Sequence, residues 1–217
     1  MLKLYSYWRS SAAYRVRIVL NLKALPHEIV PVPLTSKDNS PLLLELKQLN
    51  AASCVPVLID GERVLTQSLA IIEYLEDTYP EPSLLPKDHG DKAYVRALCQ
   101  DITSDIHPLN NLKVLRYLLK EMEASKVKKD QWIKHWLNNG FYHLEHKLTQ
   151  TDISSNLFLT GNQPSLFEAC LIPQVRNALA VNLDLTLYPI IHKIYENAMQ
   201  LMAFKEASWE QQMDYIK

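Results

Sequence analysis

The stretch YSYWRSSAAYRVRIVL, residues 5–20, joins a predicted strand to a predicted helix. Residues 2–7 read as a strand, and apolar residues at helical spacing predict a helix over about 11–24. Ser10 and Ser11 lie at the junction, where a helix presents unpaired N–H groups and the positive end of its dipole. This position suits a small anion, and especially a thiolate, because helix N-termini lower thiol pKa values. The pattern equally fits a serine that only caps the helix.

The rest of the first eighty residues alternates between strand and helix patterns. We expect a strand at 27–32, a helix at 41–49 and a helix at 68–78 that begins near Ser68. The segment VPVLIDGERVLT, residues 55–66, has two β-rich runs around Asp60-Gly61, which predicts a hairpin. The order βαβ–α–ββ–α is typical of a compact open sheet with helices on its faces, an α/β domain.

The second half of the chain is expected to be an all-α bundle. PEPSLLPKD at residues 80–88 contains three prolines, which indicates a linker. We therefore assign residues 1–80 to the first domain, 81–88 to the linker and 89–217 to the helical domain. In that domain Pro108 is expected to break a helix, Ser165-Leu166-Phe167-Glu168 is a capping box, and residues 188–204 predict one long final helix.

Composition excludes several classes of protein. Of 217 residues, 47% are apolar and the formal net charge is -1, so the basic excess of a nucleic-acid binder is missing. No apolar run approaches the ~20 residues of a membrane span, and the opening MLKLYSYWRS is too polar for a signal peptide. Cys54, Cys99 and Cys170 are widely spaced, which suits a reducing cytoplasm. His143 and His146 lack further ligands on their face, so we expect no metal site.

Two further segments of the first domain have both a structural and a functional interpretation. Val55-Pro56 opens a strand, where proline is tolerated, or it is a cis bond that turns the Val55 backbone toward an extended peptide ligand. Gln67-Ser68 starts a helix, where the side chains and free N–H groups suit a ligand carboxylate. A capping serine explains the second segment equally well.

Taken together, YSYWRSS…RVRI, VPVLIDG, TQSLAIIEYLED and LLP resemble the glutathione-binding half of a glutathione transferase of the zeta class. PLNNLKVL, ACLIPQV and NLDLTLYP in the helical half are similar to the same class, so the resemblance covers nearly the whole chain. It implies a thioredoxin-like N-terminal domain, an all-α C-terminal domain, a homodimer and glutathione as cofactor.

The resemblance also implies roles for individual residues. Ser10 falls on the catalytic serine whose hydroxyl steadies the glutathione thiolate, and Ser11 falls on the second serine, close to the sulfur. Val55 would pair with the cysteinyl backbone of glutathione, and Pro56 would be cis. The remaining contacts with glutathione, at its γ-glutamyl end and at the domain interface, are assigned to Gln67, Ser68 and Asn111.

Four residues are candidates for binding a small acidic substrate: Arg9, Arg15, His107 and Arg176. Charge-assisted hydrogen bonds from the arginines would attract a dianion, although Arg9 and Arg15 also fit ordinary solvated charges. Arg176 lies one turn before Ala180, the position where the family carries its carboxylate-binding arginine, and it also fits a surface residue. Arg17 is expected to form a structural ion pair.

The sequence departs from the family pattern at several positions. Ala12 stands in place of the cysteine of the Ser-Ser-Cys motif, and Pro41 replaces a glutamine that touches glutathione. His107 stands where a glutamine is usual, and Ala180 replaces the substrate arginine. These departures leave the glutathione site in place but weaken any assignment of the substrate.

Three hypotheses of function remain open. The zeta class includes glutathione-dependent cis–trans isomerases of maleylacetoacetate in tyrosine and phenylalanine catabolism, and this activity is the first hypothesis. The second keeps the glutathione site but conjugates small electrophiles or displaces halide from α-halo acids. The third is a binding scaffold without activity, against which the retention of both Ser10 and Ser11 argues.

Overall fold

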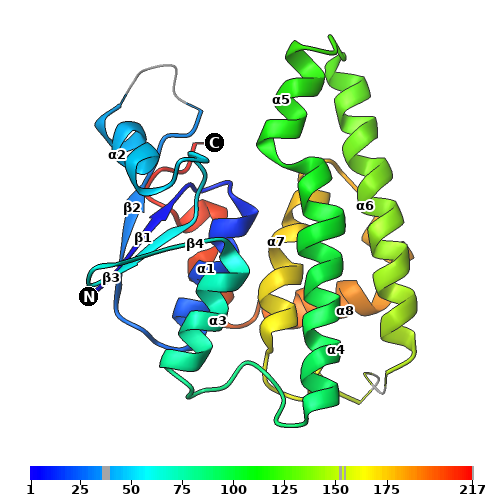
Figure 1. Cartoon of the computed structure of the whole chain (residues 1–217). Coiled ribbons are helices and arrows are strands. Elements are labelled where there is room, and N and C mark those ends of the chain that lie inside the picture. The colour runs from blue at the N-terminus through cyan, green and yellow to red at the C-terminus, as the bar shows by residue number, and fades with distance from the viewer. Residues whose placement is uncertain (36–39, 152, 154, 217) are drawn as a thin grey trace. The chain divides into compact units, whose positions relative to one another are not determined.

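In the computed structural model of the chain, the residues described are 1–35, 40–151, 153 and 155–216. They form two compact units, one of residues 1–83 with 199–217 and the other of residues 84–198. The expected combination of an α/β half and an all-α half is confirmed (Figure 1). The sequence placed residues 199–217 in the helical half, whereas the structure groups them with the sheet.

A four-stranded sheet in the order β2-β1-β3-β4 forms the centre of the first unit. Its strands are β1 (Leu2–Ser6), β2 (His27–Pro31), β3 (Val57–Asp60) and β4 (Arg63–Thr66). β1 and β2 are parallel, and β3 is antiparallel to both β1 and β4. Gly61 and Glu62 make the two-residue turn of the hairpin, since Asp60 pairs with Arg63, and Gly61 adopts a φ of 59°.

Three helices connect the strands of this unit: α1 (Ser11–Leu22), α2 (Pro41–Leu49) and α3 (Ser68–Thr78). α1 forms because Ser10 caps its start and because Ala13, Val16 and Leu20, at helical spacing, are all fully buried. It ends two residues earlier than predicted, where Ala24 takes a φ of 50°. The expected order of strands and helices is confirmed.

The second unit consists of helices, in which α4 packs against α7, and α6 packs against η1 and α8 (Figure 1). Its elements are α4 (His89–Gln100), η1 (Asp101–Ile106), η2 (His107–Asn110), α5 (Leu112–Lys120), α6 (Lys126–Thr149), α7 (Leu166–Ala180), η3 (Leu185–Leu187) and α8 (Pro189–Ala198). The break expected at Pro108 is confirmed, because α4 passes into a π-helical turn, η1, and then into the 3-10 turn that contains Pro108. In the described part of the chain, no helix is long and apolar enough to cross a membrane.

The capping box predicted at the start of α7 is confirmed. Ser165 Oγ accepts from Phe167 N at 3.2 Å, and Ser165 N donates to Glu168 Oε2 at 2.7 Å. The Glu168 carboxylate also accepts from Leu159 N at 2.8 Å, so it fixes the loop that precedes the helix.

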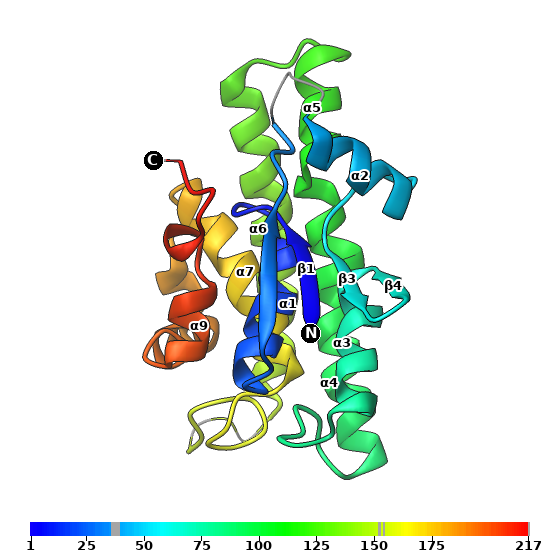
Figure 2. The ribbon, with the colours of Figure 1, turned by 90° about the vertical axis from the view of Figure 1, so that its left-hand side faces the viewer.

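The single helix predicted over residues 188–204 is wrong. α8 ends at Ala198, Leu201 is extended, and a separate helix α9 (Met202–Ala207) is followed by the short turn η4 (Trp209–Gln211). The break redirects the chain so that α9 packs against α1 (Figure 2). Tyr14 Oη donates to Phe204 O at 3.3 Å, and Asn21 Nδ2 donates to Ala203 O at 3.0 Å. The apolar spacing continues through the break without glycine or proline, so the sequence gives no local signal for it.

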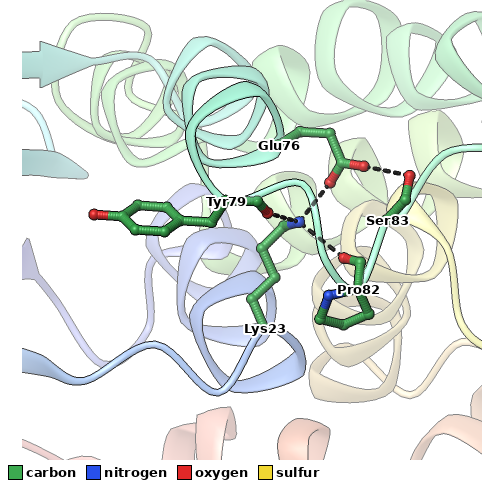
Figure 3. A network of polar contacts seen from close by, with 5 residues as sticks. All are labelled: Lys23, Glu76, Tyr79, Pro82 and Ser83. Carbon is green, nitrogen blue, oxygen red and sulfur yellow. Dashed lines mark hydrogen bonds and ion pairs between the residues drawn. The ribbon is translucent and has the colours of Figure 1, made fainter.

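A buried lysine at the end of α1 binds acceptors at and after the end of α3 (Figure 3). Lys23 Nζ lies 2.8 Å from Glu76 Oε2 and donates to the carbonyl oxygens of Tyr79, at 2.7 Å, and Pro82, at 2.9 Å. Ser83 Oγ donates to the other oxygen of Glu76 at 2.6 Å. The ammonium group, which has three N–H donors, therefore has an acceptor for each of them.

Replacing Gly140 by alanine is expected to lower the free energy of unfolding by about 1–3 kcal/mol, the usual cost of overpacking. A Cβ at Gly140, on α6, would lie 2.3 Å from both Cγ1 and Cδ1 of the buried Ile106 at the end of η1. Urea unfolding would measure the change. Because Ile106→Ala removes both clashing atoms, the double variant should be more stable than the sum of the two single changes predicts. Simple additivity would contradict this close approach.

Candidate active site

Three segments far apart in the sequence meet at one edge of the sheet. Tyr5 near the end of β1 pairs with Val57 at the start of β3, and Val57 also pairs with Thr66 at the end of β4. Because β3 runs antiparallel to both neighbours, the residues after β1, before β3 and after β4 share this edge. The edge therefore gathers the segments 7–11, 55–56 and 67–68.

Ser10 caps α1 and keeps a hydroxyl proton available. Its Oγ accepts a hydrogen bond from Ala13 N at 3.2 Å, and its backbone N–H donates to Tyr7 O at 2.9 Å. A hydroxyl has two acceptor lone pairs and one donor, so the cap leaves the O–H free to donate to a ligand. Ser11, the first residue of the helix, is buried, whereas Ser10 is half-buried. The capping and functional interpretations of Ser10 are thus compatible.

The segment before β3 is held by a short network of hydrogen bonds. Asn50 Nδ2 donates to Cys54 O at 2.8 Å, and Asn50 Oδ1 accepts from Ala52 N at 3.1 Å. The Val55–Pro56 peptide bond is cis, as the resemblance implied. Cys54 is half-buried, and its thiol donates to Ala52 O at 3.2 Å.

Gln67 and Ser68 begin α3 with an unusual backbone. Gln67, at the N-cap, has a φ of 68°, a conformation that costs a non-glycine residue on the order of 1–3 kcal/mol and that clusters at ligand sites. Ser68 is buried, and its Oγ accepts from Arg15 Nη1 at 3.3 Å. Because the Arg15 side chain is itself buried, its charge lies directly behind the start of α3.

Arg9 is exposed but contacts two indole rings of the same unit. Its guanidinium carbon lies 6.0 Å from the centroid of the Trp8 ring and 5.7 Å from that of Trp209. Such cation–π contacts restrain an otherwise mobile charge. Trp209 follows α9, so the C-terminal segment reaches the residue next to Ser10.

Arg17 has partners that the sequence did not predict. Its guanidinium donates to Ser6 Oγ at 2.8 Å, Tyr7 O at 3.4 Å and Trp8 O at 3.2 Å, rather than serving mainly in the expected ion pair. Burial lowers the pKa of Arg17 to about 10, against the opposing effect of Tyr14 and Asp214. Arg17 falls at helical spacing from the apolar residues Ala13 and Leu20, so it shares their face of the helix. This pattern was the one sequence signal for a buried cation.

The remaining site residues predicted from the sequence lie in the second unit. Asn111 is the N-cap of α5, where its Oδ1 accepts from Val114 N at 3.0 Å and its amide NH₂ is left to donate. His107 begins η2 beside the π-helical turn, a feature that often marks functional sites. Arg176 lies half-buried in α7, and Ala180 is the exposed last residue of that helix.

The described residues contain no group of three or more histidine, cysteine, aspartate or glutamate side chains that could hold a metal ion. The features gathered at the sheet edge are a hydroxyl, two helix N-termini and a buried cation behind one of them. This arrangement suits an extended ligand that carries negative charge at more than one point.

Comparisons with known proteins agree with this geometry. The family described as "Glutathione S-transferase, N-terminal domain" matches residues 4–83. A "Probable maleylacetoacetate isomerase" of Vibrio cholerae is 46% identical over 211 residues, 97% of each chain. A maleyl pyruvate isomerase structure, described as a bacterial zeta-class glutathione S-transferase, has 39% identity, a TM-score of 0.92 and coverage of 99% of this chain and 100% of that one.

A third comparison concerns a structure with a ligand. The maleylacetoacetate isomerase of Anaeromyxobacter dehalogenans, solved with GSH in its active site, is 36% identical with a TM-score of 0.84 and covers 100% of this chain and 98% of that chain. The likenesses to these three individual proteins extend over nearly the full length of both chains. The chain therefore belongs to the glutathione S-transferase family, in its zeta class.

Proposed function

We propose that the protein is a glutathione-dependent cis–trans isomerase that converts maleylacetoacetate to fumarylacetoacetate, a step of tyrosine and phenylalanine catabolism. The observation that carries the proposal is the position of Ser10, whose hydroxyl lies at the start of α1 on the edge shared with segments 55–56 and 67–68. Full-length relatives with the isomerase name support the choice of reaction.

The residues of this edge fit glutathione, a tripeptide with a thiol and two carboxylates. The N-termini of α1 and α3 both point to the edge and favour negative charge. Gln67 and Ser68 would hold the γ-glutamyl carboxylate, with the charge of Arg15 behind them. The Val55 backbone would pair with the cysteinyl residue. Arg15 thus serves the glutathione end of the site rather than the electrophile.

Bound glutathione would supply a thiolate that adds to the cis double bond, leaving a single bond that rotates before the thiolate departs. The chain's own part is to keep the sulfur ionised and in place. Ser10 donates its O–H to the sulfur, and the N-terminus of α1 favours the charged form by about 1.4 kcal/mol for each unit by which the thiol pKa falls. Ser11, the next residue in the chain, would lie close to the sulfur.

The acidic substrate would be held by residues that are not part of the sulfur site. Arg9 can attract a dianion to the edge, and His107 and Arg176 are the candidates from the helical unit. Because Ala180 replaces the family's arginine, Arg176 is the cation of α7 proposed to bind a substrate carboxylate. We further propose that the protein acts as a homodimer in the cytoplasm.

The proposal is tested by following the isomerisation of maleylacetone, a simple analogue, with and without glutathione. We expect turnover with glutathione and none with S-methylglutathione, which fills the same site but has no thiol to ionise. Glutathione binding without isomerisation would contradict the proposal. Halide release from an α-halo acid under those conditions would select transferase activity instead, the alternative that Ala12 and Ala180 favour.

A further inference from the structure

The hydroxyl of Ser10 is placed by a short turn, and that turn is held by groups from outside it. The Ser10 N–H donates to Tyr7 O at 2.9 Å, which fixes the backbone of residues 7–10 directly before α1 begins at Ser11. Tyr7 O also accepts from Arg17 Nη1 at 3.4 Å. One carbonyl therefore connects the buried guanidinium directly to the backbone of Ser10.

Arg17 also joins this turn to the C-terminal segment. While its two terminal nitrogens bind Ser6, Tyr7 and Trp8, its Nε donates to Ala207 O at 2.9 Å, at the end of α9. The rigid fork of guanidinium donors suits several fixed oxygens at once, which a lysine cannot match.

Trp8 is held on both sides of its backbone. Its carbonyl accepts from Arg17, and its N–H donates to Asp214 Oδ2 at 3.0 Å. Its ring lies edge-on to Trp209, with centroids 5.6 Å apart, and to Tyr215, at 5.0 Å. The C-terminal segment thus contributes two aromatic rings and a carboxylate to the residue that follows Tyr7.

We propose that Arg17 and Asp214 are positioning residues for Ser10. The C-terminal segment, residues 207–215, is therefore needed to place the Ser10 hydroxyl that binds the sulfur of glutathione. Neither residue touches glutathione in this proposal. They hold Tyr7 and Trp8 so that the Ser10 hydroxyl is aimed at the sulfur. The inference rests on the proposed function, because it assumes that Ser10 steadies the thiolate.

The experiment compares Arg17→Met, Asp214→Ala and Asn21→Ala in the full chain. Asn21 is a matched control, since it joins α1 to α9 through Ala203 O at 3.0 Å but, within the described residues, has no side-chain bond to the turn that precedes α1. The readout is the ultraviolet absorbance of bound glutathione thiolate as a function of pH, together with kcat and the glutathione Kd. Asp214→Asn retains an oxygen that can accept from Trp8 N and serves as the conservative variant.

We expect Arg17→Met and Asp214→Ala to raise the apparent pKa of bound glutathione by about one unit and to lower kcat about tenfold at neutral pH. The Kd should change less than threefold, Asp214→Asn should recover most of the loss, and Asn21→Ala should retain the wild-type thiolate pKa. Asp214 is only partly buried, so its variants remain informative if Arg17→Met fails to fold.

An unchanged thiolate pKa in folded Arg17→Met and Asp214→Ala, or an equal shift in Asn21→Ala, would overturn the inference. The titration needs no electrophile. A wild-type protein that ionises glutathione without isomerising maleylacetone would therefore overturn the proposed function alone, while the comparison of variants still decides the role of Arg17 and Asp214.

Discussion

Replacing Ser10 by alanine is expected to lower kcat for glutathione-dependent isomerisation by about 10²-fold, the usual effect of removing one hydrogen bond to a developing or stored negative charge. The variant loses the O–H that we propose donates to the sulfur, so the apparent pKa of bound glutathione should also rise. Stopped-flow isomerisation of maleylacetone over a range of pH would measure both effects. Near wild-type turnover at neutral pH would exclude Ser10 as the group that steadies the thiolate.

The cap at the start of α1 provides the control for this experiment. Ser10→Ala also removes the bond from Ala13 N, which costs about 1 kcal/mol of stability. Ser10→Asp restores a capping oxygen but places a charged acceptor without a proton beside the sulfur. We expect it to regain stability and to stay inactive, whereas Ser10→Thr, which retains the hydroxyl, should be active. Recovery of activity in Ser10→Asp would mean that the cap alone mattered.

Replacing Lys23 by methionine is expected to lower the free energy of unfolding by about 3–5 kcal/mol, because it leaves the buried Glu76 carboxylate without its cation. The Lys23 side chain is 0% exposed and that of Glu76 11%, and Glu76 Oε2 is itself buried, so water has little access to the oxygen that loses its partner. The carbonyl oxygens of Tyr79 and Pro82 lose a donor at the same time (Figure 3). Guanidinium chloride unfolding at neutral pH would give the change.

Lys3→Met is the matched control, since it makes the same substitution in the same unit. Lys3 pairs with Glu28 at 3.3 Å, but the two side chains are 48% and 42% exposed, and such surface pairs contribute about 0–1 kcal/mol. Adding Glu76→Leu to Lys23→Met removes the uncompensated charge and should recover part of the loss. If the two lysine substitutions lowered the free energy of unfolding equally, the contacts of Lys23 with Glu76, Tyr79 and Pro82 would contribute no more to stability than a surface ion pair.

Local patterns in the sequence predict most of the fold. The cap at Ser10, the hairpin at Asp60-Gly61, the break at Pro108 and the capping box at Ser165 each depend on a few neighbouring residues, so a short stretch of sequence is enough to specify them. The meeting of three segments at one sheet edge also follows once the order and direction of the strands are known.

The features that the sequence did not predict depend on contacts between distant residues. α8 ends at Ala198, and the chain then turns so that α9 packs against α1. No residue near Ala198 indicates this distant contact in the sequence. The sequence predicted an ion pair for Arg17 and no role for Lys23, whereas the acceptors of these cations include the carbonyl oxygens of Ala207 and Pro82. Most partners of these two cations are backbone carbonyls, and these have no signature in sequence.

The unit that carries Ser10 is built from both ends of the described chain, which has a consequence for biosynthesis. A ribosome adds about 5–20 residues per second, so residues 84–198 delay the arrival of α9 by roughly ten seconds after β4 and α3 have been made. The helical unit is continuous and can fold first. The Nε of Arg17 lacks its acceptor until Ala207 has emerged, so we expect the proposed thiol-ionising site to reach its final form last, after the helical unit of residues 84–198 has been made.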